Sequence, residues 1–86
     1  MILNLVLNAD WYMQFEEKQM HIEYREITPY WTKRIWDNRD EITLVKLRKG
    51  YTKKAMILKV DKITKGKLPG FESHGLLYLI HTKGSI

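Results

Sequence analysis

The apolar residues of this chain fall into five short segments, some alternating with polar residues and others almost wholly apolar. Successive side chains of a strand point to opposite faces, so alternation indicates a half-buried strand and a short apolar run indicates a fully buried one. Each segment is six to nine residues long, which is typical of strands. The predicted strands are residues 1–7, 21–26, 42–48, 55–63 and 76–81.

Two short helices are predicted in the first half of the chain, where capping residues precede helically spaced aromatic side chains. Residues 8–10 offer N-cap side chains to a helix that carries Trp11 and Phe15 on one face. Thr28 and Pro29 combine a capping hydroxyl with a proline suited to the first helical position. These elements predict an α+β, mainly β fold: a small, partly open β-barrel of about five strands with the helices over its mouth or side.

The absence of cysteine excludes a disulfide scaffold, a thiolate zinc site and a cysteine nucleophile. A chain of 86 residues is expected to form one domain, residues 1–86. Its longest apolar run is about six residues, far below the roughly 20 of a membrane span, and no basic leader precedes it. We therefore expect a soluble, cytoplasmic protein that does not associate with membranes.

The three histidines are the remaining candidates for metal binding. His21, His74 and His81 lie 53 and 7 residues apart, and no carboxylate stands at metal-ligand spacing from them. The serines lack the G-x-S-x-G context of a hydrolase nucleophile, and no glycine-rich phosphate loop is present. No metal and no cofactor are expected.

The net charge of +5 is distributed unevenly along the chain. Residues 1–43 contain five basic and eight acidic residues, a formal charge of −3. Residues 44–86 contain ten basic and two acidic residues, a formal charge of +8. This asymmetry indicates an anionic partner for one face. A surface of solvated lysines that keeps the protein soluble is the alternative.

The stretch from residue 23 to residue 36, EYREITPYWTKRIW, concentrates acidic, basic and aromatic side chains within fourteen positions. Aromatic faces stack on nucleobases, guanidinium groups bind phosphates or base edges, and carboxylates accept from exocyclic amines. The stretch therefore predicts a base-sized cleft; alternatively, its aromatic residues belong to the core and its charges pair locally. The predicted cleft residues are His21, Glu23, Arg25, Tyr30, Trp31, Lys33 and Arg34, with Trp31 or Trp36 as a stacking platform.

A second site is predicted in the hairpin of the third and fourth strands, where nine basic residues between 46 and 67 are opposed only by Asp61. Contacts of such residues with phosphates set affinity and its salt dependence rather than sequence choice. The alternative is an exposed hairpin that lysines keep soluble and protect from edge pairing. The predicted phosphate-binding residues are Lys46, Arg48, Lys49, Lys53, Lys54 and Lys59.

The pattern E-Y-R-x-x-x-P-Y-W-x-x-R-I, followed by R-K-G-Y and a C-terminal Y-L-I…G-x-I, resembles the ASCH family. More narrowly, it is similar to the short ASCH-like proteins of bacteria and their phages. The resemblance covers nearly the whole chain, and residues 23–25 with 29–31 and Arg34 form its best motif. It implies a PUA-like β-barrel with a cleft between barrel and helix, and it implies RNA binding.

Some members of the wider family resemble enzymes, notably small bacterial amidohydrolases that remove the acetyl group from N4-acetylcytidine. Those enzymes use a Lys, a Thr and a Glu, the first two within a Gly-x-Lys-x-x-Thr-x-Arg segment. When that Arg is aligned with Arg25, Met20 takes the Lys position, Glu23 takes the Thr position, and the Gly is missing. Because Met20 supplies neither a nucleophile nor a base, the remaining catalytic candidates are Glu23, Lys18 and Lys33.

Three functions of different classes are thus consistent with the sequence. The leading hypothesis is a binding module for RNA or single-stranded nucleic acid, with a base-sized cleft and a basic hairpin face. The second is a nucleoside- or RNA-directed hydrolase or nuclease that uses Glu23 with Lys18 or Lys33. The third is a phage-encoded inhibitor whose basic face binds an acidic protein of the host.

Overall fold

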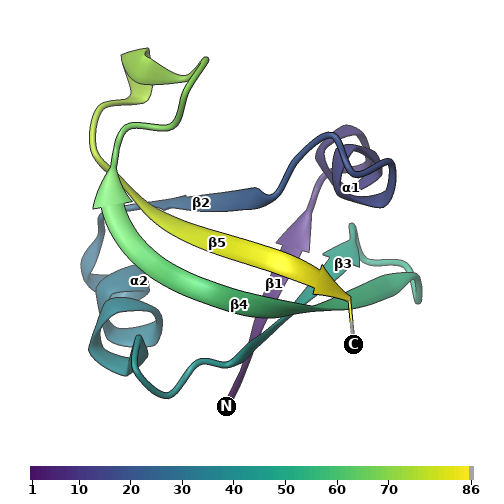
Figure 1. Ribbon diagram of the computed structural model, residues 1–86, viewed down its shortest axis with the longest axis horizontal. Coiled ribbons are helices and arrows are strands. Elements are labelled where there is room, and N and C mark those ends of the chain that lie inside the picture. Colours follow the sequence, from purple (N-terminus) through teal and green to yellow (C-terminus); the bar gives the residue numbers. More distant parts are fainter. Residues whose placement is uncertain (86) are drawn as a thin grey trace.

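The computed structural model describes residues 1–85, which form a five-stranded sheet with two short α-helices (Figure 1). The strand order is β1-β3-β4-β5-β2; β1 pairs with β3 in parallel, and every other neighbouring pair is antiparallel. Ile86, the last residue of the Gly84-x-Ile86 motif, lies outside the described residues. The elements are β1 (Ile2–Leu7), α1 (Ala9–Glu16), β2 (Ile22–Glu26), α2 (Pro29–Arg34), the 3₁₀ helix η1 (Trp36–Asn38), β3 (Leu44–Lys49), β4 (Ala55–Gly66), the 3₁₀ helix η2 (Glu72–His74) and β5 (Leu77–Ser85).

The sheet curls into a half-barrel whose two edges are β1 and β2 (Figure 1). These edge strands do not pair with each other. A side chain links them instead, because Nη2 of Arg25 on β2 donates a hydrogen bond to the carbonyl of Val6 on β1 at 3.0 Å. The predicted α+β, mainly β arrangement of five strands and two helices is confirmed.

β4 and β5 are longer than their apolar patterns predict. β4 continues three residues beyond position 63, and β5 continues four residues beyond position 81. The added residues are mostly polar, yet Thr64 and Lys65 still pair with Leu79 and Tyr78 across the ladder. Backbone hydrogen bonds extend a strand whatever its side chains are, which is why hydrophobicity alone ends both strands too early.

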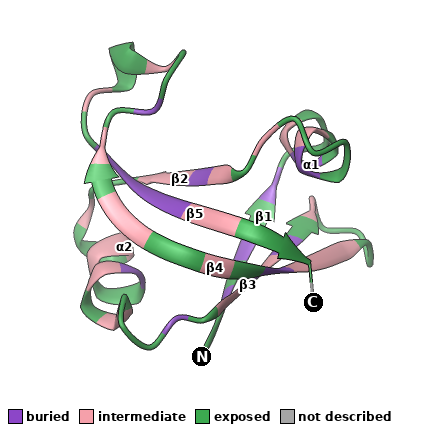
Figure 2. Cartoon of the chain, in the orientation of Figure 1, coloured by how far each residue is buried: buried purple, intermediate pink, exposed green. Residues whose placement is uncertain are grey.

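The main core lies between the inner face of the sheet and the two helices. α1 buries Tyr12 and Phe15, whereas Trp11, which was expected to share the core face with Phe15, is only half-buried. Figure 2 shows the buried first half of β5 crossing the centre of the molecule. The buried residues of this cluster are Leu3, Leu5, Leu7, Tyr12, Phe15, Ile35, Ile42, Val45, Leu47, Leu58, Tyr78 and Ile80.

A second, smaller cluster covers the outer face of β5. Leu77 and Leu79 are buried there with Leu68, which belongs to the long loop between β4 and β5. Ile22 and Tyr24 of β2 pack against the same cluster. The first part of β5 is therefore buried on both faces, and the apolar face of β2 points outward to this cluster rather than into the barrel.

Both helices begin at the capping residues that the sequence indicated. Oδ1 of Asn8 accepts a hydrogen bond from the backbone N–H of Trp11 at 2.8 Å, and Oγ1 of Thr28 accepts one from that of Trp31 at 3.2 Å. Pro29 occupies the start of α2. The helices span eight and six residues. Within residues 1–85, no helix is long and apolar enough to cross a membrane.

Candidate functional site

Two cavities follow one another along β1, on the side of the strand that has no sheet neighbour. One has a volume of about 510 Å³ and lies between the end of β1, the start of α1 and β2. The other, of about 450 Å³, lies between the start of β1 and α2. Trp31 lines both. We call the two cavities together the β1 groove. The first cavity is lined by Val6, Leu7, Asn8, Asp10, Trp11, Gln14, Glu23, Tyr24, Arg25, Glu26, Thr28, Trp31 and Phe71. The second is lined by Met1, Ile2, Leu3, Asn4, Tyr30, Trp31, Lys33, Arg34 and Asn38.

Glu23 is the one charged side chain of residues 1–85 that is fully buried, with 2% of its surface exposed. It points into the barrel because it stands opposite the core residue Ile80 on β5, and paired residues share a face. Its Oε1 accepts two hydrogen bonds, from the indole Nε1 of Trp11 at 3.2 Å and from the backbone N–H of Tyr24 at 2.7 Å. The carboxyl group is thereby fixed in orientation.

The other oxygen of this carboxyl group is unused. Oε2 of Glu23 accepts no hydrogen bond from the described residues, and its neighbour Nε of Arg25 donates none. Nη2 of Arg25 lies 3.7 Å from Oε2, close enough for an ion pair but too far for a hydrogen bond. A free acceptor and a free donor thus belong to two ion-paired side chains that both line the first cavity of the groove. Buried polar atoms of this kind usually have partners.

Burial raises the pKa of Glu23 above its ordinary value of 4.5, because desolvation penalises the carboxylate. The charge of Arg25 and the hydrogen bonds from Tyr24 and Trp11 lower the pKa, but they do not outweigh burial. At a pH where Glu23 is ionised, its desolvated carboxylate destabilises the fold. Side chains with strongly perturbed ionisation in a cleft are typical of functional sites.

Aromatic rings and cations line the groove around this pair. The guanidinium carbon of Arg25 lies 5.0 Å from the ring centre of Trp31. Trp31 packs edge-to-face on Tyr30, which is 55% exposed, and the guanidinium of Arg34 covers the Tyr30 ring at 3.5 Å. At the other end, Trp11 packs edge-to-face on Phe71. The groove offers flat apolar surfaces next to positive charge.

The structure distributes the predicted cleft residues over more than one cavity. Glu23, Arg25 and Trp31 line the first cavity of the β1 groove. Tyr30, Lys33 and Arg34 line the second cavity together with Trp31. His21 is exposed and lines a third cavity beneath α1, away from the groove. The prediction of a single base-sized cleft therefore corresponds to a longer groove with two compartments, and His21 is not part of it.

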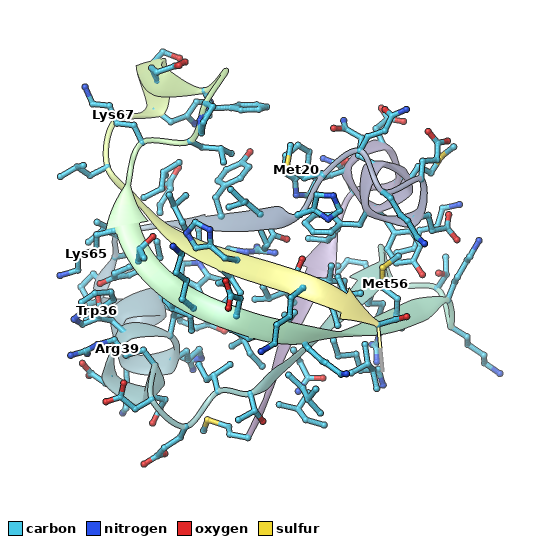
Figure 3. The ribbon with its side chains drawn as sticks, in the orientation of Figure 1. Met20, Trp36, Arg39, Met56, Lys65 and Lys67 are labelled. Carbon is cyan, nitrogen blue, oxygen red and sulfur yellow. The ribbon has the colours of Figure 1, made fainter. Side chains whose placement is uncertain are left out.

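Trp36, the alternative stacking platform, lies outside the β1 groove. Its ring stacks on Tyr78 at 5.7 Å between centres. The guanidinium of Arg39 and the amino group of Lys65 lie 4.2 Å and 4.3 Å from the ring centre, and Figure 3 shows these side chains gathered beside α2. Because Trp31 lines both cavities of the groove and Trp36 lines neither, Trp31 is the better placed of the two platforms.

The catalytic candidates do not converge. Glu23 lines the first cavity of the groove, Lys33 lines the second, and Lys18 lines the cavity beneath α1. Met20 is half-buried and packs on the main core. Residues 1–85 contain no group of three or more histidine, aspartate or glutamate side chains that could hold a metal ion.

The predicted phosphate-binding residues fall into two groups. Lys46, Arg48 and Lys59 share the outer face of the β3–β4 hairpin, since they stand opposite Ile57, Ala55 and Leu44 in register. The other three lie near the tip of the hairpin, and one of them is already paired. Nζ of Lys54 lies 2.8 Å from a carboxylate oxygen of Glu16, so this lysine anchors the hairpin to α1. Lys49 ends β3, and Lys53 is exposed in the turn.

Comparison with known proteins finds no matching family model, no matching curated protein and no matching solved structure. The likeness to the ASCH family therefore stays a prediction that rests on the residues quoted above.

Three groups of the site were missed by sequence reasoning. Trp11 donates a hydrogen bond to Glu23 through its indole N–H, the carbonyl of Val6 accepts one from Arg25, and Phe71 lines the first cavity of the groove. They come from three segments that only the curl of the sheet brings together. A tryptophan just after a helix cap is a weak signal at best, and a backbone carbonyl leaves none in the sequence.

Proposed function

We propose that this protein is an ASCH-like, PUA-like module that binds single-stranded nucleic acid in the β1 groove. The half-barrel with a groove between its edge and two helices supports this proposal, since the ASCH resemblance implies a cleft between barrel and helix. The two compartments, which share Trp31, suit two successive nucleotides. Their flat walls suit the bases, which stack on aromatic side chains whatever their identity.

The observation that carries the proposal is the unused pair formed by Oε2 of Glu23 and Nε of Arg25. Every nucleobase presents a hydrogen-bond donor next to an acceptor on one of its edges, for example the amino group and ring nitrogen of cytosine. An acceptor beside a donor on the protein is complementary to such an edge. Both atoms are buried, and both side chains line the first cavity of the groove, so a base in that cavity would reach the two atoms once the Arg25 side chain moves aside.

The position of the basic face supports the same proposal. Lys46 and Arg48 on β3 stand opposite Asn4 and Val6 on β1, so their side chains project beside the strand that borders the groove. A single-stranded nucleic acid whose bases enter the groove can therefore keep its phosphates over the outer face of the hairpin. In this arrangement the lysine and arginine residues supply affinity, while Glu23 and Arg25 contact bases.

The proposal predicts how binding depends on salt. We expect the double variant Lys46→Gln/Arg48→Gln to bind a fluorescent single-stranded RNA more weakly than the wild type. Its plot of log affinity against log salt concentration is expected to be shallower by about 0.7 for each phosphate that the variant no longer neutralises. Fluorescence anisotropy titrations at several salt concentrations measure the affinity and its salt slope. Titration with single-stranded DNA of the same sequence tests whether the protein contacts the 2′-hydroxyl groups of RNA.

The matched control is Lys62→Gln/Lys67→Gln, which removes the same charge from residues outside both the groove and the face beside β1. This control should retain the wild-type slope to within about 0.7, the value of one neutralised phosphate. Equal slopes for the two double variants would show that charge alone drives binding. Binding of an acidic protein that survives nuclease treatment, with no affinity for RNA or DNA, would contradict the proposal.

Nucleoside hydrolysis is a second candidate, and the raised pKa of Glu23 is the observation that favours it, because a raised pKa extends the pH range in which a carboxyl group can act as a general acid. The first cavity of the groove, however, has no lysine among its lining residues. Turnover of N4-acetylcytidine that depends on Glu23 would establish this second function.

A further inference from the structure

A third cavity lies beneath α1 and shares no lining residue with the β1 groove. Its volume is about 670 Å³, within the range of about 300–1,000 Å³ that small-molecule sites occupy. It is enclosed by α1, the segment that leads to β2, the start of β4 and the end of β5. The lining residues are Tyr12, Phe15, Glu16, Lys18, Met20, His21, Lys54, Ala55, Met56, Leu58, Thr82, Lys83, Gly84 and Ser85.

The cavity exists because the sheet loosens at this point. β4 and β5 pair between Leu58 and Ser85, but their register shifts twice before regular pairing resumes at Lys62. Gly84 adopts a φ of +114°, a conformation open to glycine and rare for other residues. α1 has only eight residues, and three of them, Tyr12, Phe15 and Glu16, line the cavity. Irregular strand pairing under a short helix thus leaves room for a ligand.

The floor of the cavity is apolar and adaptable. Tyr12, Phe15 and Leu58 are buried in it, and Met20 and Met56 are half-buried. Figure 3 shows the two methionines on different elements, Met20 near the start of β2 and Met56 on β4. Thioether side chains are flexible and polarizable, so they can adjust to ligands of different shape.

The rim of the cavity is positively charged. Three lysines and one glutamate line it, giving a formal charge of +2. Lys54 is paired with Glu16 at 2.8 Å, whereas Lys18 and Lys83 have no carboxylate within 4 Å among the described residues. Lys18 adopts a φ of +59°, which turns the chain sharply as it leaves α1.

We propose that this cavity binds a monoanionic amphiphile, a single acyl or alkyl chain that ends in a carboxylate. The apolar floor removes the chain from water, and each buried methylene group contributes about the same increment of affinity. The carboxylate remains at the rim beside Lys18 and Lys83. A neutral ligand would leave these charges unused, and a small anion would leave the floor empty.

Decanoate below its micelle-forming concentration is the probe. We expect saturable binding in isothermal titration calorimetry, with decanol and butyrate binding at least tenfold more weakly. Lys18→Gln/Lys83→Gln should weaken decanoate binding roughly tenfold and leave decanol binding unchanged. Lys62→Gln/Lys67→Gln is the charge-matched control and should bind decanoate as the wild type does.

Methyl NMR of the methionines locates the ligand on the folded protein. Decanoate should shift the signals of Met20 and Met56 and leave that of Met13, an exposed residue of α1 outside the cavity, unchanged. Equal affinity for decanol and decanoate, no difference between the two double variants, or shifts confined to Met13 would each overturn the proposal. A loss of RNA binding in other variants would not bear on it, because this cavity and the β1 groove share no residue.

Discussion

Replacing Arg25 with Ala is expected to lower the free energy of unfolding by about 3 kcal/mol at neutral pH. The substitution removes the only cation near the buried carboxylate of Glu23 among the described residues. It also removes the hydrogen bond to Val6 that links the two edges of the half-barrel and the contact with the Trp31 ring. Arg25 is 22% exposed, so some solvent screening is included in this figure. Urea denaturation followed by circular dichroism measures the change.

The double variant Arg25→Ala/Glu23→Gln distinguishes the effect of the ion pair from the effect of packing. Because no charge is left unpaired in it, we expect it to recover about 2 kcal/mol of the loss caused by Arg25→Ala alone. Arg34→Ala is the matched control: it removes an arginine that also covers an aromatic ring but pairs with no carboxylate among residues 1–85. Additive effects of the two substitutions would contradict the coupling of Glu23 and Arg25.

Glu23→Gln is expected to make the protein more stable and to bind nucleic acid less well. The amide oxygen must occupy the place of Oε1, which accepts from Trp11 and Tyr24. The amide NH₂ then takes the place of Oε2 and presents a donor where the carboxyl group presents an acceptor. We expect a gain of about 1 kcal/mol in the free energy of unfolding and a loss of roughly tenfold or more in affinity for single-stranded RNA.

The stability that Glu23→Gln gains over the wild type should increase as the pH rises. Because the pKa of Glu23 is raised in the folded state, the folded protein binds a proton more tightly than the unfolded chain does. The stabilisation that comes from this tighter proton binding is complete below the pKa of Glu23 in the unfolded chain. It is lost as the pH rises through the pKa of Glu23 in the folded protein. The difference between Glu23→Gln and wild type should therefore grow as the pH rises above 4.5, the ordinary pKa of this group, until the carboxyl group is ionised in the folded protein as well. A difference that stays constant, or shrinks, over that range would contradict a raised pKa.

β2, the strand that carries Glu23 and Arg25, shows how much of the site the sequence can predict. Alternation along residues 22–25 predicts Glu23 and Arg25 on one face of β2 and Ile22 and Tyr24 on the other, and the register with β5 has them so. It did not indicate which face points inward, because the strand is covered on both sides. The loop between β4 and β5 carries Leu68 back over the outer face and gives the apolar residues of β2 a core of their own. The charged face is thus left to line the barrel.

The groove itself depends on long-range geometry. β1 and β2 are separated by α1 in the sequence and by three strands in the sheet, and only the curl of the sheet brings Val6 next to Arg25. Local patterns predict elements and faces, as they did for Asn8, Thr28 and the hairpin lysines. They carry no information on how far a sheet curls, which is why Trp11 and Phe71 were absent from the predicted site.

Crosslinking of the protein to a single-stranded RNA that contains 4-thiouridine, followed by mass spectrometry, tests the central claim most directly. The hairpin residue Tyr51 serves as an internal reference, since it is 93% exposed and would capture a ligand that binds without a defined site. If the β1 groove binds the strand, crosslinks will form at Tyr30 and Trp31 and will disappear in competition with unlabelled RNA. Crosslinks at Tyr51 alone, or none at either groove residue, would contradict the claim.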